Sequence, residues 1–315
     1  MECKICGNTT NLEQYKVKEM MFGFRDEFLY FQCQQCQCLQ IADIPDNMNK
    51  YYPSNYYSYT TTFPYAKSKL NEIIKKTRDR YVIFKKGFIG KLLLNYLPST
   101  NLHLNSLSEI SITKNTSILD VGCGSGKFLL LLQKLGLNKL TGIDPYLEKD
   151  IQYKNNLNIY KKAIHDVKEK YDVIMFHHSF EHMSDPLETL QSVSNLLHQN
   201  GYCIIRIPTV SSYAWQHYKE NWVQLDAPRH FFLHSQESIQ YLAEKTGLKV
   251  EKVIYDATVF QFLGSERYLK NIPLTDPKAN SSIFSADQIQ SFKQQTKELN
   301  QKDLGDACAF ILRKK

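Results

Sequence analysis

The chain has 315 residues, of which 43% are hydrophobic and 23% are charged, so it can bury a substantial core as one large domain or two. Its formal net charge of +7 is modest and scattered, and by itself it favours neither a nucleic acid nor a membrane as partner. The sequence contains no 18-residue apolar stretch, and its start, "MECKICGN", lacks the apolar core of a signal peptide. We therefore expect a cytoplasmic protein without a transmembrane segment.

Five of the eight cysteines lie within the first 38 residues, in "CKICG" and "CQQCQC". In a reducing compartment this clustering indicates metal binding rather than disulfides. Four thiolates in two C-x-x-C pairs can close a tetrahedral zinc site and so supply folding energy to a small unit. We predict a structural Zn2+ bound by four cysteines, with a redox pair or unliganded thiols as alternatives: Cys3, Cys6, Cys33 and Cys36. Cys38 could replace Cys36, and the 26 residues between the pairs leave room for a hairpin.

Three segments are expected along the chain. Residues 1–45 form a zinc-ribbon-like module, residues 46–110 a linker and a basic helical segment, and residues 111–315 the main domain. Five linker tyrosines could form a lid over a bound molecule or simply pack, namely Tyr51, Tyr52, Tyr56, Tyr57 and Tyr59. The basic stretch 66–97 is amphipathic and interrupted near Gly87 and Gly90. It is either a solvated helix face or a rim that attracts an acidic substrate, such as a nucleotide-linked or lipid-linked sugar.

From about residue 115 the pattern alternates between strand and helix. The expected strands are "TSILDVG", "KLTGID", "LNIYKKAI", "YDVIMFHH" and "YCIIRIP". One helix ends at Gly136, and another begins after Asp185 as N-cap, with Pro186 in its first turn, and ends before Gly201. This order predicts an α/β fold with a parallel sheet covered on both faces. The last strand, "DACAFILRK", can insert antiparallel.

The stretch "DVGCGSG" lies at a strand-to-helix turn. Gly122, Gly124 and Gly126 let the backbone turn tightly and admit a ligand against the main chain, towards which the helix N–H groups point. Asp144 ends the next strand, where its carboxylate can accept hydrogen bonds from both hydroxyls of a ribose. A P-loop would need Ser or Thr after Lys127, and a dinucleotide fold would place the third glycine one residue later.

This G-x-G-x-G spacing after Asp120 resembles the first motif of the class I S-adenosylmethionine-dependent methyltransferases, and "TGIDP" resembles their second. "YDVIMFHHSFEHMSDP" and "GYCIIRIPT" are similar to the fourth- and fifth-strand segments of that family. "NWVQLDAPRHFFLHSQESIQYLAEKTGLKV" resembles a segment of bacterial methyltransferases from polysaccharide and natural-product pathways, and the resemblance covers residues 115–315. It implies a doubly wound, mainly parallel, seven-stranded Rossmann-like sheet with S-adenosylmethionine at the strand ends.

The resemblance also implies the cofactor site. The turn from Gly122 to Gly126, with the backbone of Cys123, is expected to contact the amino-acid part of the cofactor, with Asp120 near its ammonium group. Asp144 binds the ribose. The remaining expected neighbours of the cofactor are Pro145 beside the ribose, Ala163 and Ile164 near the adenine, and His178 at the end of a strand.

The acceptor is the open question. The sulfonium methyl is already activated, so the enzyme mainly aligns the reactants, and a hydroxyl acceptor also needs a base. His182 and His230 are the candidate bases, with packing as the alternative role. Arg229 could bind an acidic group or brace a loop, and Tyr213 and Trp222 could line the acceptor pocket or pack in the core.

We expect a small-molecule acceptor, most simply a hydroxyl of a saccharide or natural-product intermediate. RNA or protein methylation is the alternative, although no compact RNA-binding motif is present. A non-catalytic, cofactor-binding scaffold is the alternative outside enzymes. The sequence indicates neither the atom that is methylated nor the oligomeric state.

Overall fold

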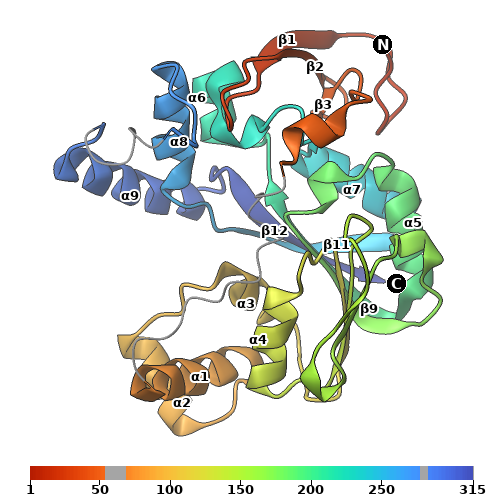
Figure 1. The fold of residues 1–315 in the computed structure, drawn as a ribbon, viewed down its shortest axis with the longest axis vertical. Helices are drawn as coiled ribbons and strands as arrows, with labels where there is room; N and C mark the ends of the chain where they lie inside the picture. Colours follow the sequence, from red (N-terminus) through yellow and green to blue (C-terminus); the bar gives the residue numbers. More distant parts are fainter. Residues whose placement is uncertain (54–68, 277–282, 315) are drawn as a thin grey trace.

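The structure is a computed structural model that describes residues 1–53, 69–276 and 283–314. Its centre is an eight-stranded sheet in the order β11-β12-β9-β8-β4-β5-β7-β6 (Figure 1). The strands are β4 (Ser117–Val121), β5 (Lys139–Ile143), β6 (Ile151–Gln152), β7 (Asn158–Tyr160), β8 (Tyr171–His177), β9 (Leu197–Pro208), β11 (Leu248–Tyr255) and β12 (Ala307–Lys314).

Strand directions agree with the predicted mainly parallel sheet. β9, β8, β4, β5 and β7 pair in parallel. β12 lies between β9 and β11 and is antiparallel to both, which confirms the expected insertion of the last strand. The eighth strand, which the prediction of seven did not include, is the two-residue β6, paired antiparallel with β7.

Helices cover both faces of the sheet, which makes the fold doubly wound. Because successive side chains of a strand point to opposite faces, Ile118 packs into one apolar core and Leu119 into the other. The first core includes residues of α1 (Lys69–Phe84), α3 (Leu102–Leu107) and α4 (Lys127–Leu135). The second includes residues of α5 (Pro186–Leu196) and α7 (Gln236–Lys245).

Several helix ends follow the local signals, although Asp185, the expected N-cap of α5, forms no capping hydrogen bond through its side chain. Gly136 adopts a left-handed conformation after α4, and Ser235 caps α7 by accepting a hydrogen bond from the backbone of Ser238. α5 begins at Pro186 but ends at Leu196, earlier than the expected end near Gly201. The difference arises because Leu197 already pairs with Tyr171, so the sheet takes up the residues after the helix.

The N-terminal residues form a second, antiparallel sheet in the order β1-β2-β3-β10. Its strands are β1 (Leu12–Lys18), β2 (Glu27–Cys33), β3 (Leu39–Ile41) and β10 (Phe232–Leu233). β10 comes from the segment between β9 and β11 of the main sheet and pairs with β3. The apolar core under this sheet is continuous with one core of the main sheet, so the boundary expected at residue 45 is bridged by a strand and by shared packing.

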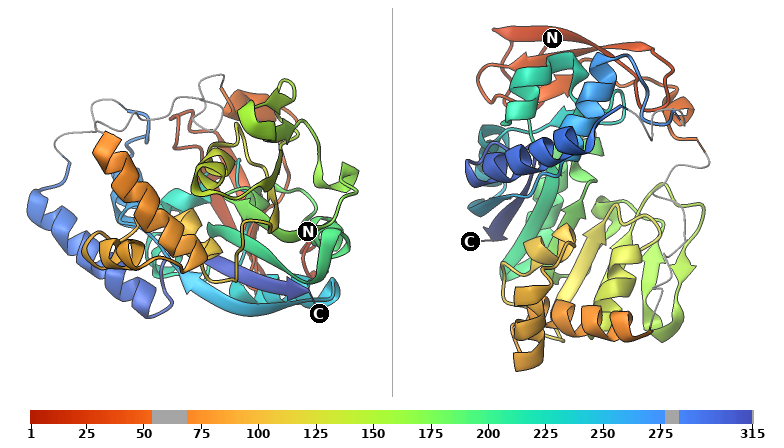
Figure 2. Two further views of the ribbon diagram at one scale, coloured as in Figure 1. Left: turned by 90° about the horizontal axis from the view of Figure 1, so that it is seen from below. Right: turned by 90° about the vertical axis from the view of Figure 1, so that its left-hand side faces the viewer.

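The basic stretch forms a helical hairpin. α1 is followed by a break at Gly87 and by α2 (Phe88–Tyr96). Gly90 does not interrupt α2: it faces α1, where a Cβ atom would lie 2.6 Å from Cβ of Tyr81. In the right panel of Figure 2 this hairpin lies at the end of the molecule opposite to the N-terminal sheet.

Two further helices, α6 (Tyr213–Tyr218) and α8 (Phe260–Leu269), lie near the N-terminal sheet (Figure 1). A third, α9 (Ala286–Gln301), packs on α8, where the rings of Phe262 and Phe292 stack. Short 3-10 turns complete the chain: η1 (Met48–Tyr51), η3 (Lys154–Asn156), η4 (Ile164–Asp166), η5 (Phe180–His182), η6 (Lys219–Asn221) and η7 (Val223–Leu225). Across the ranges given above, no helix combines the length and the apolar character needed to cross a bilayer.

Candidate functional site

The glycine turn joins β4 to α4 at the carboxyl edge of the sheet. Gly122, Gly124 and Gly126 all have positive φ, between 52° and 73°. A Cβ on Gly122 would lie 2.4 Å from Cβ of Ser179, and one on Gly126 would lie 2.6 Å from Cδ1 of Ile159. The turn therefore requires glycine both for its conformation and for its close contacts with the neighbouring strand ends.

Asp144 holds the turn against the next strand. One carboxylate oxygen accepts a hydrogen bond of 2.9 Å from the backbone N–H of Gly124, and the other accepts one of 2.9 Å from Tyr146. Each oxygen keeps a further lone pair, which leaves the carboxylate able to accept from two ribose hydroxyls. The side chain predicted to bind the ribose is thus fixed beside the glycine turn.

Asp120 is buried at the end of β4. Burial and the nearby charge of Asp144 raise the pKa of its carboxyl to about 8. A buried carboxyl in this state lacks a cationic partner. The ammonium group of an amino-acid moiety would supply that partner, which fits the role expected for Asp120.

The other expected cofactor neighbours lie along the same edge. β5 and β7 are adjacent, and the backbone N–H of Asp144 donates to the carbonyl oxygen of Tyr160. Pro145 follows β5 and is exposed, whereas Ala163 and Ile164 follow β7, with Ile164 buried. Cys123 is half-buried within the turn, and burial raises the pKa of its thiol, which stays neutral. The strand order therefore places these residues at the same edge of the sheet as the glycine turn.

The segment after β8 lies directly against the glycine turn. The Ser179 hydroxyl donates a hydrogen bond of 2.6 Å to the carbonyl oxygen of Val121. His178 has a positive φ of 54°, and its ring contacts the Arg206 guanidinium and, at 3.4 Å, the Glu181 carboxylate. The same short segment carries His182, whose backbone N–H donates a hydrogen bond of 3.2 Å to the carbonyl oxygen of Ser179. His182 therefore lies in the segment that packs against the glycine turn.

Glu181 is the buried centre of a cluster of imidazoles. Nε2 of His230 lies 3.9 Å from Oε1 of Glu181 and 3.8 Å from Oδ2 of Asp226. The His182 and His230 rings are 4.8 Å apart between centroids, in an edge-to-face arrangement. Burial raises the pKa of Glu181, but the contact with His178 and the charges of His182 and His230 outweigh it and lower the pKa to about 2. Glu181 is therefore ionised at neutral pH.

Backbone carbonyls set the orientation of both histidines. Nδ1 of His182 is 2.6 Å from the carbonyl oxygen of Arg229, and Nδ1 of His230 is 2.7 Å from that of Gln224. Because a carbonyl only accepts, each Nδ1 carries the hydrogen, and each neutral ring keeps its lone pair on Nε2. Burial lowers the pKa of His182, so this ring is neutral at pH 7. The arrangement places an unprotonated Nε2 of His182 and the ring of His230 beside an anionic group.

Arg229 links this segment to the N-terminal residues. Its fully buried guanidinium donates to Asp226 at 2.7 Å and to Glu19 at 2.9 Å. It also donates to the carbonyl oxygen of Tyr51 at 3.2 Å. These contacts match the loop-bracing alternative considered for Arg229. They connect Glu19 and Tyr51 to the segment that carries His230.

The two aromatic residues expected near the acceptor lie in different surroundings. Trp222 is fully buried, and its indole N–H donates a hydrogen bond of 3.0 Å to Asp306. Tyr213 is half-buried at the start of α6, where its ring stacks on His217 at 5.2 Å. Of the linker tyrosines, Tyr51 and Tyr52 are described and lie near Arg229 and His182. Tyr56, Tyr57 and Tyr59 fall outside the described residues.

Four residues that the sequence did not single out take part in the site. Glu181 and Asp226 flank the imidazoles, Glu19 pairs with Arg229, and the His103 ring of α3 stacks on His177 at 4.3 Å. Glu181 directly precedes the candidate base His182 in the sequence, and this adjacency was a signal. Glu19 and His103 gave none, because their partners lie far away in sequence.

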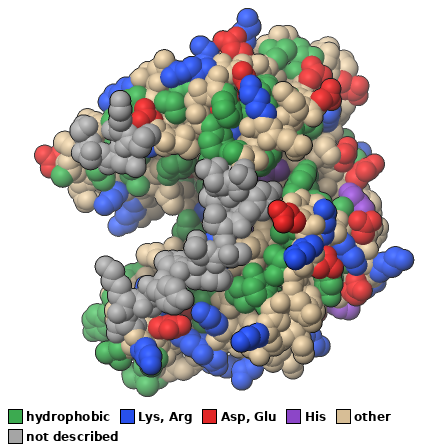
Figure 3. All heavy atoms as spheres, in the orientation of Figure 1, with side chains coloured by type: hydrophobic (Ala, Val, Ile, Leu, Met, Phe, Trp, Pro, Cys, Tyr) green, Lys and Arg blue, Asp and Glu red, His purple; other side chains and the backbone are tan. Residues whose placement is uncertain are grey.

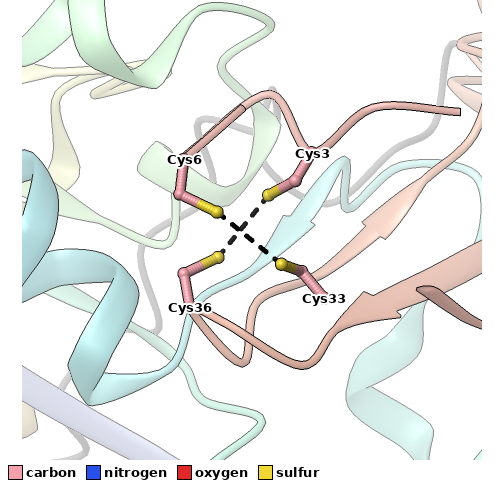
Figure 4. A group of neighbouring side chains, drawn as sticks. All are labelled: Cys3, Cys6, Cys33 and Cys36. Atoms are coloured by element: carbon pink, nitrogen blue, oxygen red, sulfur yellow. Dashed lines mark hydrogen bonds between the residues drawn. The ribbon is translucent and has the colours of Figure 1, made fainter. Parts of the chain in front are cut away.

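The first 36 residues bring four thiols together (Figure 4). Sγ of Cys3 is 3.5 Å from Sγ of Cys36, Sγ of Cys6 is 3.6 Å from Sγ of Cys33, and all four sulfurs lie within 4.8 Å of one another. Four thiolates about 2.3 Å from a tetrahedral zinc ion would be about 3.8 Å apart, so the cluster fits such an ion.

Neighbouring groups support this ligand set. The Gln40 and Asn8 side-chain amides donate to sulfurs of the cluster, at 3.1 Å and 3.4 Å. Sγ of Cys38 instead contacts the carbonyl oxygen of Leu233, at 3.5 Å, so Cys36 rather than Cys38 completes the set. The 26 intervening residues contain the β1–β2 hairpin.

The doubly wound sheet with an antiparallel last strand, the glycine turn and the acid after the second strand define a class I S-adenosylmethionine-dependent methyltransferase. A family model described as a methyltransferase domain matches residues 91–253. The chain belongs to this family.

More distant comparisons give partial matches. The chain is 28% identical over 112 residues to a tRNA U34 carboxymethyltransferase of Alteromonas mediterranea, covering 31% of this chain and 34% of that protein. It is 34% identical over 89 residues to a ribosomal protein L11 methyltransferase of Polynucleobacter necessarius, covering 25% and 27%. The chain thus spans about a third of the length of these curated relatives. A solved methyltransferase of Archaeoglobus fulgidus is similar at 17% identity and a TM-score of 0.40, covering 79% of this chain and 100% of that one.

Proposed function

We propose that this protein transfers the methyl group of S-adenosylmethionine to a hydroxyl oxygen of a small-molecule acceptor, a saccharide or natural-product intermediate. The observation that carries the proposal is the pair His182 and His230 beside the ionised, buried Glu181, adjacent to the glycine turn. A hydroxyl must lose its proton as it attacks the methyl carbon, and this cluster can take that proton.

The two imidazoles have different surroundings and so suit different roles. Carboxylates of Glu181 and Asp226 lie within 4 Å of Nε2 of His230, where they would stabilise an imidazolium. His182 is kept neutral by burial, so its Nε2 can accept a hydrogen bond and orient the acceptor. We assign proton removal to His230 and orientation to His182, following the rule that differing environments separate such roles.

The proposal includes the rest of the site. Bound S-adenosylmethionine supplies the electrophilic methyl group. Asp120 would hold its ammonium group, Asp144 its ribose, and the glycine turn its amino-acid part. The four cysteines would bind a structural Zn2+, because with all four ligands from the protein no position stays open for a substrate. Since such thiolates persist in a reducing compartment, we place the protein in the cytoplasm.

The test uses labelled cofactor. Methyl-labelled S-adenosylmethionine is incubated with the protein and with saccharide, small-molecule, RNA and protein fractions of a cell extract. The proposal predicts label in the saccharide or small-molecule fraction, and a loss of at least about a hundredfold in His230→Gln. The matched control is His198→Gln, an exposed histidine at the start of β9. Full turnover by His230→Gln would contradict the assigned base.

A second candidate is methylation of RNA or protein. It is favoured by the partial matches to a tRNA and a ribosomal-protein methyltransferase. Label that enters only the RNA or protein fraction would establish this alternative.

A further inference from the structure

The α1–α2 hairpin presents an apolar surface that no other described element covers. Phe88, Ile89 and Tyr96 of α2 are 80%, 67% and 78% exposed. The other large exposed apolar side chains of this surface are Leu70, Ile73, Leu92 and Leu97. Figure 3 shows hydrophobic side chains gathered at the lower left, over the hairpin.

The helix geometry explains why this surface faces outwards. Phe88, Leu92 and Tyr96 follow one another at intervals of four residues, so they share one face of α2. Gly90 is on the opposite face, where a Cβ atom would lie 2.8 Å from the carbonyl oxygen of Thr77 in α1. The close approach of the two helices at Gly90 therefore directs the aromatic face away from the protein.

The same hairpin is strongly basic. Residues 69–97 contain eight Lys or Arg and two Asp or Glu, a net charge of +6, which is most of the charge of the whole chain. Six of its lysines are exposed and form no ion pair with a carboxylate in the described ranges: Lys69, Lys75, Lys76, Lys85, Lys86 and Lys91. Asp79, by contrast, is buried and paired with Arg78 at 2.8 Å.

We propose that the α1–α2 hairpin docks on an anionic lipid surface, with the aromatic face of α2 inserted between head groups and the lysines bound to their phosphates. Exposed aromatic and aliphatic side chains flanked by lysines are the combination that binds at such an interface. A second copy of the chain is disfavoured as occupant, because two surfaces of +6 would repel each other.

The hairpin borders a hollow in the molecular surface. Figure 3 shows a notch at the left edge of the molecule, between the part with α8 and α9 and the part with α1 and α2. The inference rests on the hairpin alone and not on the proposed acceptor.

Flotation with vesicles tests the docking. The full-length protein is mixed with vesicles of phosphatidylglycerol and phosphatidylcholine in equal parts, or of phosphatidylcholine alone. We expect binding to the anionic vesicles only, weakened about tenfold by each of Phe88→Ser and Ile89→Ser and about fivefold by each of Lys75→Gln and Lys76→Gln. Binding of the wild type to neither vesicle, or unchanged binding of the Phe88→Ser variant, would overturn the proposal.

Matched controls separate this surface from general effects. Leu187→Ser removes an exposed leucine of α5, and Lys293→Gln with Lys297→Gln removes two exposed lysines of α9. These variants are expected to float with the vesicles as the wild type does. If sedimentation instead shows a wild-type dimer that Phe88→Ser dissociates, the face is an interface between copies and the lipid proposal is wrong. Calorimetric binding of S-adenosylmethionine, measured on each variant, reports on the methyltransferase site separately.

Discussion

At the residue scale, two buried carboxyl groups of the site, those of Asp120 and Glu181, have pKa values that are shifted in opposite directions. Asp120 has no cationic partner among the described residues, and burial together with the charge of Asp144 raises its pKa to about 8. Glu181 is surrounded by imidazoles, and its pKa falls to about 2 in spite of burial. A bound ammonium group would give the Asp120 carboxyl its partner, whereas the Glu181 carboxylate already lies among imidazole rings.

Asp120→Asn should weaken S-adenosylmethionine binding by about 1.5–3 kcal/mol, the scale of a hydrogen bond to a charged group, as measured by calorimetry. The same change should stabilise the unliganded fold. The unfolded chain loses this proton near pH 4 and the folded chain near pH 8, so the wild type loses stability as the pH rises between these values.

Asp306→Asn is the matched control for Asp120→Asn. Burial also raises the pKa of Asp306, to about 7. This residue precedes β12, not the glycine turn, and its carboxylate accepts a hydrogen bond from the Trp222 indole. The affinity of the Asp306→Asn variant for S-adenosylmethionine should equal that of the wild type. Equal affinity in the Asp120→Asn variant as well would remove Asp120 from the binding site.

Glu181→Gln should lower turnover by about ten- to a hundredfold with little change in cofactor affinity, because an amide cannot stabilise a neighbouring imidazolium. Glu181 stabilises the fold only while it is ionised. The difference in unfolding free energy between wild type and variant should therefore shrink as the pH falls below about 4.5 towards 2. Denaturant titrations at several pH values measure this difference, and a difference that grows on acidification would contradict the account.

At the scale of elements, the strand-turn-helix unit of β4, the glycine turn and α4 could be predicted because its signals are local. The glycines, the apolar strand and the left-handed Gly136 all lie within 20 residues. The early end of α5 could not be predicted in this way, because it depends on the pairing of Leu197 with Tyr171, which lies in another strand. Two-residue strands such as β6 and β10 have no sequence period to recognise.

Gly122→Ala tests the close contact between the turn and the segment of Ser179. Gly247→Ala is its control: Gly247 has φ of 73°, against 72° for Gly122, but nothing lies within 4 Å of its added Cβ. Both variants should lose about 1 kcal/mol of stability from the strained backbone. Only Gly122→Ala, with its clash at 2.4 Å, should lose 1–3 kcal/mol more and bind S-adenosylmethionine more weakly. Equal losses in thermal melts and calorimetry would refute the contact.

At the scale of the whole molecule, the N-terminal residues are part of the main body. Glu19 pairs with Arg229 across 210 residues of sequence, and β10 completes the N-terminal sheet. The cysteine spacing predicted the cluster, since its two pairs are local. The sequence carried no signal for these long-range partners, which only the folded chain brings together.

Loss of the cysteine cluster should therefore affect the whole fold. We expect one zinc ion per chain by elemental analysis, and its loss in Cys36→Ser together with a lower melting temperature. Cys38→Ser is the control, because its sulfur lies outside the cluster, and it should retain the metal. Zinc retained by Cys36→Ser but lost by Cys38→Ser would reverse the ligand assignment.

At every scale, the carboxyl edge of the sheet is expected to bind S-adenosylmethionine. Isothermal titration of the purified protein with S-adenosylmethionine, S-adenosylhomocysteine and NAD tests it most directly. The account predicts one site per chain for the two sulfur compounds, weakened in Asp144→Ala, and no binding of NAD. Binding of NAD without binding of either sulfur compound would contradict it.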